Sequence, residues 1–175
     1  MKARLFTTLF VMIALTGCMQ MKPIDFMDAK PRFVLEEFFD GQTQASGIFE
    51  DRFGNLRREF VVEINGVWDG ETLVLNEDFF YSDGEREQRI WTIEKIDDHT
   101  YQGRADDIIG VATGESYGNV LNWRYYMDLK LDDSTIRVHF DDWMYLQPSG
   151  VMLNRAKVSK WGIELGTVTL AFTKK

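Results

Sequence analysis

From residue 43 onward, apolar and polar side chains alternate along the chain with a period of two. In one such stretch Phe60, Val62 and Ile64 alternate with Glu59 and Glu63. Successive side chains of a β-strand point to opposite faces, so this alternation predicts strands with one apolar and one polar face. We count about nine or ten such segments, each roughly 8–15 residues from the next. The pattern therefore predicts an all-β fold.

Turn sequences rich in Gly, Asn, Asp and Ser separate the predicted strands. The clearest are Phe53-Gly54-Asn55, Asn65-Gly66, Ser82-Asp83-Gly84, Asp132-Asp133-Ser134 and Pro148-Ser149-Gly150. Because no long helical crossover lies between the segments, consecutive strands are expected to pair antiparallel as a meander. Closure removes the exposed edges of a meander, which predicts a lipocalin-like barrel of about 8–10 strands. Residues 31–175 are expected to form this single β-barrel domain.

One hairpin can be registered from its turn alone. Read as a three-residue loop with Gly in the left-handed position, Ser82-Asp83-Gly84 pairs Tyr81 with Glu85. The register then places Phe79 opposite Glu87, Glu77 opposite Arg89, Leu75 opposite Trp91 and Leu73 opposite Ile93. The apolar pairs fall on one face, which independently supports this register. The same face then carries Glu77 beside Arg89.

A single short helix is predicted before the first strand, over residues 31–39. Four apolar residues recur on one helical face: Val34, Leu35, Phe38 and Phe39. Pro31 suits the first helical turn, and Gly41 suits the position just beyond the helix end. An extended strand is the alternative for this segment.

The N-terminus has the pattern of a secretory signal. Lys2 and Arg4 precede an apolar stretch over residues 5–15, and small residues follow it. The stretch is too short for a membrane-spanning helix, which needs roughly 20 apolar residues. A plain signal peptide with an incidental cysteine is one interpretation of this pattern.

The sequence Leu15-Thr16-Gly17-Cys18 resembles the lipobox of bacterial lipoproteins. The resemblance implies a removed signal peptide over 1–17 and a lipidated tether over 18–30. It also implies a covalent diacylglycerol and an N-acyl chain on Cys18, which would hold the domain on a membrane. Met19 stands where an Asp would signal inner-membrane retention. The expected location is therefore the cell envelope, at the periplasmic face of the outer membrane.

Charge and composition exclude some classes of partner. The formal net charge is −8, and removing Lys2 and Arg4 with the signal makes it −10. This acidity argues against nucleic acid, whose phosphates are met by Lys and Arg, and against a broad basic surface for anionic lipids. Cys18 is the only cysteine, so the mature domain has no disulfide and depends on its core for stability.

Local sequence supports neither catalysis nor a metal site. No Gly-x-Ser-x-Gly motif occurs. Two histidines, His99 and His139, without a cysteine in the mature chain argue against a zinc site. Four Asp-Asp pairs occur, at 97–98, 106–107, 132–133 and 141–142, without the D-x-D-x-D-G spacing of a calcium loop. The protein is therefore predicted to be no enzyme and to need no cofactor beyond its acyl chains.

Five polar residues stand on or beside otherwise apolar strand faces: Glu77, Arg89, Asp107, Arg124 and Asp142. Asp142 shares a face with Val138 and Phe140, and a carboxylate pointing inward there is costly unless it is paired or hydrogen-bonded. Arg124 is a solvated outer residue if Trp123 faces the core, and joins the others inside if the strand bulges. The set is interpreted either as ion pairs that fix register, as a ligand-facing cluster, or as catalytic carboxylates.

Motifs spread over nearly the whole mature chain resemble a family of small bacterial lipoproteins, domain of unknown function 3833. They are Gly54, Gly66-Val67-Trp68, Leu75-Asn76-Glu77-Asp78-Phe79, Asp83-Gly84-Glu85, Arg89-Ile90-Trp91, Tyr101-Gln102-Gly103, Asp107 to Gly110, Gly118-Asn119, Asp141-Asp142-Trp143-Met144-Tyr145 and Asn154-Arg155-Ala156. The resemblance implies a lipocalin-like, calycin-type barrel and supplies no catalytic residue. Gly66-Val67-Trp68 echoes the lipocalin Gly-x-Trp but follows an earlier strand, which departs from the true lipocalins.

The leading functional hypothesis is a non-catalytic envelope lipoprotein. Its barrel would bind or carry a small amphiphile such as a lipid or fatty acid, by analogy with the fold. The alternative is a structural or assembly lipoprotein with a filled barrel and a protein partner of unknown identity. An enzyme using paired carboxylates is the third hypothesis.

Overall fold

The computed structural model describes residues 20–131 and 134–175 of the chain. The predicted signal segment 1–17, Cys18 and the Asp132-Asp133 turn lie outside these residues. The described elements are η1 (Pro23–Phe26), α1 (Leu35–Phe39), β1 (Gly41–Asp51), β2 (Leu56–Trp68), β3 (Thr72–Tyr81), β4 (Arg86–Lys95), β5 (Thr100–Arg104), β6 (Ile108–Tyr117), β7 (Val120–Leu131), β8 (Ser134–Leu146), β9 (Met152–Lys160) and β10 (Ile163–Lys174).

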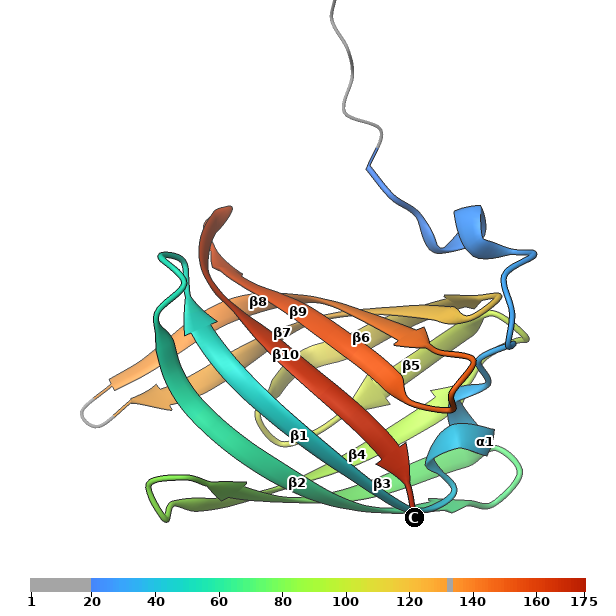
Figure 1. Ribbon diagram of the computed structural model, residues 1–175, viewed down its shortest axis with the longest axis horizontal. Helices are drawn as coiled ribbons and strands as arrows, with labels where there is room; N and C mark the ends of the chain where they lie inside the picture. The colour runs from blue at the N-terminus through green and yellow to red at the C-terminus, as the bar shows by residue number, and fades with distance from the viewer. Residues whose placement is uncertain (1–19, 132–133) are drawn as a thin grey trace, which may run out of the picture.

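Within the described residues, ten strands form one closed antiparallel barrel (Figure 1). Each strand pairs with its neighbours in sequence, and β1 closes the barrel by pairing with β10 from Thr43 opposite Lys174 to Asp51 opposite Gly166. The predicted all-β meander and its closure are confirmed. Ten strands is the upper end of the predicted range.

Helix α1 and the residues before it close one end of the barrel, beside the chain's C-terminus (Figure 1). Phe33, Leu35, Phe38 and Phe39 are all buried there, and the ring of Phe39 lies 5.8 Å from that of Phe172 at the end of β10. Apolar side chains on one helical face thus cover the core, as the spacing predicted.

The helix is shorter than its predicted span. It begins at Leu35 rather than near Pro31, because the preceding chain is extended, with φ −119° and ψ 115° at Val34. The amide of Phe33 donates to the carbonyl of Gly118, 2.7 Å away, which holds this extended segment on the β6–β7 turn. Gly41 has φ 93° just beyond the helix end, as predicted for that position.

The predicted turn at Asn65-Gly66 is wrong, because both residues lie inside β2. Asn65 pairs with Gln42 and Asn76 on the two neighbouring strands, and Gly66 pairs with Gly41. A side chain on Gly66 would collide with the carbonyl of Phe39. The glycine is therefore explained by the close approach of α1 to the strand rather than by a turn.

The β3–β4 hairpin has the predicted register. Tyr81 donates its amide to the carbonyl of Glu85 at 3.1 Å, and Glu77 stands opposite Arg89. Leu75 opposite Trp91 and Leu73 opposite Ile93 follow in the same register, and all four are buried. The three-residue loop thus fixes which side chains of both strands face the interior.

The middle of the barrel is filled around Trp123 on β7. Its indole lies 5.9 Å from that of Trp91, edge to face, and a side chain on Gly114 of the adjacent strand would overlap the Trp123 ring. The bare backbone of Gly114 therefore leaves the space that the indole occupies.

Residues 23–30, within the range predicted as a tether, include the 3₁₀ turn η1, which lies on the outer wall. The ring of Phe26 lies 6.4 Å from that of Trp143 and 6.3 Å from that of Tyr145 on β8. No helix among the described residues is long and apolar enough to cross a membrane.

Gly114→Ala is expected to lower the free energy of unfolding by about 1–3 kcal/mol, because its methyl group overpacks the Trp123 site. Chemical denaturation monitored by tryptophan fluorescence measures the change. Thr113→Ala, at an exposed position on the same strand, is the control and should alter stability by no more than about 0.5 kcal/mol. Equal stability of the two variants would contradict the packing described here.

Candidate functional site

A set of polar side chains lies inside the barrel, between the plugged end and the opposite, turn end. Glu77 on β3 and Arg89 on β4 stand directly opposite each other and both face inward, as predicted. The Glu77 carboxylate lies 3.8 Å from the Arg89 guanidinium, and their side chains are only 14% and 19% exposed. The two charges therefore meet in a largely desolvated place.

Asp107 completes the surroundings of Arg89. It lies in the β5–β6 turn, one residue before β6, and both its oxygens receive hydrogen bonds from the Arg89 Nε, at 3.2 and 2.9 Å. A second guanidinium nitrogen lies 2.8 Å from the same carboxylate. This forked arrangement makes Asp107 the principal counterion of Arg89 and leaves Glu77 the weaker partner.

Asp142 on β8 also points inward, as predicted, and is 7% exposed. Its carboxylate accepts a hydrogen bond from the side-chain amide of Asn154 on β9. The other atom of that amide, Asn154 Oδ1, is buried and has no hydrogen-bond partner among the described residues. The site therefore contains a buried acceptor that could receive a hydrogen bond from a bound molecule.

Burial dominates the acidity of the two carboxyl groups. It raises the pKa of Glu77 to about 7, with Arg89 opposing the shift and Asp107 adding to it. Burial likewise raises the pKa of Asp142 to about 7, against the hydrogen bond from Asn154 and with help from the charges of Asp141 and Glu77. Burial thus favours the protonated form of both groups.

Arg124 does not belong to this set. Its side chain is 47% exposed on the outer wall and lies 3.6 Å from Asp141. Trp123 and Tyr125, its neighbours on β7, are buried, so the strand keeps its alternation here. Of the two predicted alternatives for Arg124, the solvated outer position is confirmed and the inward one is wrong.

Above the polar set, toward the turn end, the interior is lined by aromatic rings. Phe60, Phe79 and Tyr81 face inward, and the ring of Phe60 lies 6.1 Å from Phe79 and 5.5 Å from Tyr81. All three are only partly buried although they face the interior. Arg58 lies over the Tyr81 ring at 3.6 Å and forms a polar rim. We refer to Phe60, Phe79 and Tyr81 as the aromatic mouth.

Two hollows of about 560 Å³ each open on the outer wall. One crosses β1, β2, β3 and β10, where its lining includes the outward-facing Ser46, Val61, Phe80 and Ala171. The other lies against Tyr126, His139, Lys160 and Trp161. The outer wall is thus a second place where a small molecule could lie.

Each of the two histidines packs against a tyrosine ring. His99 lies 4.1 Å from the ring of Tyr117, and its Nδ1 is 2.8 Å from the carbonyl oxygen of Ser116. His139 lies 5.0 Å from Tyr126. Among the residues that the structure describes, no group of three or more His, Cys, Asp or Glu side chains is placed to hold a metal ion.

Sequence reasoning missed a second buried ion pair, at the plugged end. Glu36 of α1 is 6% exposed, and its carboxylate receives hydrogen bonds from the Lys95 ammonium at 2.6 Å and the Tyr101 hydroxyl at 2.8 Å. Burial raises the Glu36 pKa, but these hydrogen bonds outweigh it and leave the pKa below its usual value. Its partners lie far along the chain, so no local pattern pointed to the pair.

These features define a closed antiparallel barrel with one plugged end, a buried polar set and an aromatic mouth. The chain belongs to the family described as protein of unknown function (DUF3833), whose model matches residues 12–174. No curated protein matches the chain. The predicted family is confirmed, and the match extends over the whole barrel.

Asp142→Asn is expected to flatten the dependence of stability on pH. The Asp142 pKa is about 7 in the native state and 3.8 ordinarily, so between these values the folded protein binds a proton that the unfolded chain does not. Stability therefore falls as pH rises through this window, and the neutral amide removes that loss. At about pH 8 the variant should be more stable than the wild type by a few kcal/mol.

Denaturant unfolding at several pH values between about 4 and 8 measures the slope. Glu77 retains its own titration, so the variant should lose part of the slope rather than all of it. Thr113→Ala, at an exposed position on β6, removes no titratable group, so it is the control and should leave the slope unchanged. A slope equal to the wild type's in Asp142→Asn would contradict the burial assigned to this carboxylate.

Proposed function

We propose that this protein is an envelope lipoprotein whose barrel binds or carries a small amphiphile. The observation that carries the proposal is the aromatic mouth, where inward-facing apolar side chains are incompletely buried. Leu129, Val168 and Leu170 are likewise partly buried hydrophobic residues packed against the core. A small barrel can hold one small ligand, and incompletely covered apolar side chains supply the contact that such a ligand seeks.

The buried polar set below the mouth bears on the class of amphiphile. Arg89 is matched by Asp107, so Glu77 and Asp142 remain as carboxyl groups with little compensation. The ionised form of these groups would repel a fatty-acid carboxylate placed beside them. A neutral or cationic head group would find acceptors, including Asn154 Oδ1. The proposed ligand is therefore a lipid-like molecule with a hydrogen-bond-donating or cationic head.

The anchor is the second part of the proposal. The sequence Leu15-Thr16-Gly17-Cys18 supports lipidation of Cys18 and attachment to a membrane of the envelope. A diacylglycerol and an N-acyl chain there would keep the barrel at the periplasmic face of the outer membrane. The carried amphiphile would then have a membrane within reach.

The filled interior around Trp123 favours the alternative, a structural lipoprotein with a protein partner. Trp91 packs on Trp123, Tyr125 packs on Trp91, and Phe140 stacks on Tyr125. These rings fill that half of the barrel, which leaves the mouth as the place for a ligand. The two functions differ in whether the mouth takes up an apolar molecule.

A matched pair of substitutions on β10 tests the amphiphile. Val168→Trp should fill the mouth and abolish uptake of the neutral dye N-phenylnaphthylamine, because Val168 faces inward. Thr169 faces outward and lines the hollow on β1 and β10, so Thr169→Trp should leave uptake unchanged. Dye fluorescence and lipids extracted from the purified full chain are the measurements, with circular dichroism confirming the fold.

The reverse result, with Thr169→Trp abolishing uptake, would move the ligand to the outer wall and contradict an interior site. Absence of both dye binding and co-purified lipid in the wild type would favour the filled, structural barrel instead.

Cys18→Ser is expected to prevent lipidation and to release the protein from the membrane fraction or leave it uncleaved. Metabolic labelling with palmitate in a bacterial host measures this, with wild type as the reference. Labelling of the variant as strong as that of the wild type would rule out the anchor at Cys18.

A further inference from the structure

Two large aromatic side chains stand in solvent on neighbouring turns. Phe53, between β1 and β2, is 74% exposed, and Trp161, between β9 and β10, is 89% exposed. The turns are adjacent because β1 pairs with β10, and the amide of Arg52 donates to the carbonyl of Leu165 at 2.9 Å. In Figure 1 these turns lie at the end of the barrel away from α1 and residues 20–30.

The backbone at Trp161 is in an unfavourable conformation for its side chain. Lys160 pairs with Ile163, so Trp161 and Gly162 form a two-residue turn with φ 52° and 80°. Such turns favour Asn-Gly, because a side chain with φ above zero is strained. Burial of the ring does not offset the strain, since it is almost fully exposed. A strained residue held in this way points to a role beyond stability.

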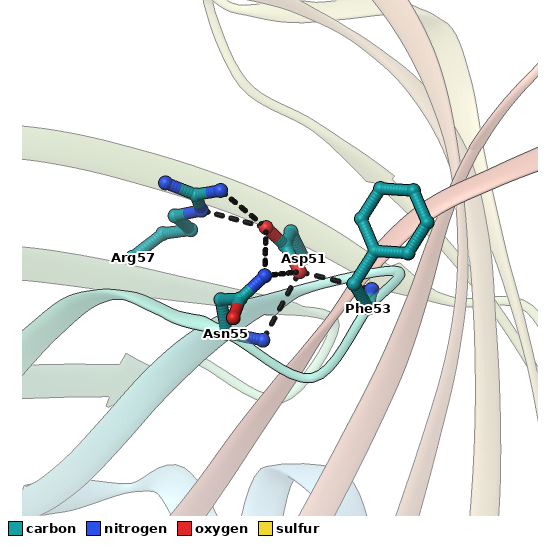
Figure 2. A network of polar contacts seen from close by, with 4 residues as sticks. All are labelled: Asp51, Phe53, Asn55 and Arg57. Atoms are coloured by element: carbon teal, nitrogen blue, oxygen red, sulfur yellow. Dashed lines mark hydrogen bonds and ion pairs between the residues drawn. The ribbon is translucent and has the colours of Figure 1, made fainter.

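Phe53 is presented by a well-ordered turn. Figure 2 shows the Asp51 carboxylate at the centre of a network from which the Phe53 ring projects away. Asp51 accepts hydrogen bonds from the amides of Phe53 and Asn55, at 2.9 and 3.0 Å, and from Arg57 Nε at 2.7 Å. Burial raises the Asp51 pKa, but these hydrogen bonds outweigh it and hold the pKa well below its ordinary value. Asp51 is therefore an ionised carboxylate that Arg57 compensates.

A cationic side chain lies over each exposed ring. The Arg52 guanidinium lies 4.6 Å from the centre of the Phe53 ring, and the Lys160 ammonium lies 4.7 Å from that of Trp161. Leu56 and Ile163, in the same two hairpins, are also more than half exposed. The chain as a whole has a net charge of −8. Two cationic side chains beside exposed aromatic rings therefore contrast with the acidic character of the molecule. We name Arg52, Phe53, Lys160 and Trp161 the turn-end patch.

We propose that the turn-end patch docks the barrel onto a phospholipid bilayer. Aromatic rings with adjacent polar groups are favoured at the level of the lipid head groups, where Phe53 and Trp161 would insert. Arg52 and Lys160 would meet the lipid phosphates, to which their charge is complementary. Two separate protruding tips suit a deformable surface, into which each ring can insert without a preformed pocket.

The turn-end patch and η1 lie toward opposite ends of the barrel. Phe26 of η1 packs on Tyr145, next to the end of β8, and the amide of Phe33 donates to Gly118 in the β6–β7 turn at the plugged end. A chain anchored ahead of η1 would therefore direct the turn-end patch away from its own bilayer. The patch would then contact a second membrane, unless the barrel tilts back onto the first. This inference does not depend on an amphiphile in the barrel.

The test uses the full chain reconstituted into phosphatidylcholine donor vesicles, mixed with acceptor vesicles that contain phosphatidylglycerol. Donors loaded with sucrose are sedimented, and the acceptor lipid carried down is measured. The Phe53→Ala, Trp161→Ala double variant should reduce docking by roughly tenfold, because both inserted rings are lost. Arg52→Glu and Lys160→Glu should each reduce it by roughly fivefold, with most of the effect on the anionic acceptors. Val67→Ala, exposed on β2 toward the plugged end, is the control and should dock as the wild type does.

Brominated lipid locates the contact. Quenching of tryptophan fluorescence by brominated acceptors supports docking on a second membrane, and quenching by brominated donors supports docking on the anchoring membrane. Trp161→Phe should lose this quenching while retaining docking, which identifies the reporter. Absence of quenching from either vesicle, or docking that persists in the double variant, overturns the proposal. Dye uptake in the same variants reports the proposed amphiphile site separately.

Discussion

The pairing of β1 with β10 is the constraint on which the rest of the structure depends. It runs from Thr43 opposite Lys174 to Asp51 opposite Gly166 and turns an open meander into a closed barrel. Once the sheet is closed, each strand has partners on both sides, so its register is fixed and alternate side chains are committed to the interior. The same pairing brings the Phe53 and Trp161 turns together. The core, the polar set and the turn-end patch are thus consequences of one closure.

The carboxyl groups of the polar set have raised pKa values because the strand register holds their side chains inside the barrel. Glu77 and Arg89 cannot turn outward without moving every apolar side chain of their strands to the wrong face. Arg89 is satisfied by Asp107 from a turn, whereas Glu77 and Asp142 are left with raised pKa values of about 7. A buried, incompletely paired carboxyl group lowers stability and is often replaceable by an apolar residue without loss. A role in ligand binding explains the presence of two such groups beneath the aromatic mouth better than a role in stability does.

Local sequence patterns were sufficient to predict the structure where the contacts that determine it lie between residues close in sequence. The Ser82-Asp83-Gly84 loop fixed the register of β3 and β4 and hence the Glu77–Arg89 pair. For Arg124 the sequence left an outer and an inner position open, because alternation alone does not exclude a bulge, and the structure shows the outer one. Contacts between distant segments could not be read in this way. Lys95 meets Glu36 across 59 residues, and Asp107 reaches Arg89 from a turn 18 residues away. Asn65-Gly66 has the composition of a turn, but a glycine is needed there because the backbone of Phe39 in α1 lies too close to the strand for a side chain. Packing overrode propensity there.

The two ends of the barrel are built for different tasks. At one end Glu36, buried against Lys95 and Tyr101, fixes α1 over the core, and Phe33 ties the preceding segment to the β6–β7 turn. Such satisfied, buried contacts contribute rigidity and closure. At the other end the interior aromatic rings are half covered, and Trp161 is held in a strained conformation in solvent. Strain and exposed apolar surface both lower stability, and the strained Trp161 and the exposed ring of Phe53 both lie at the end where the interior is accessible. Selection for stability alone would remove these features, so the turn end is where the function of this barrel is best sought.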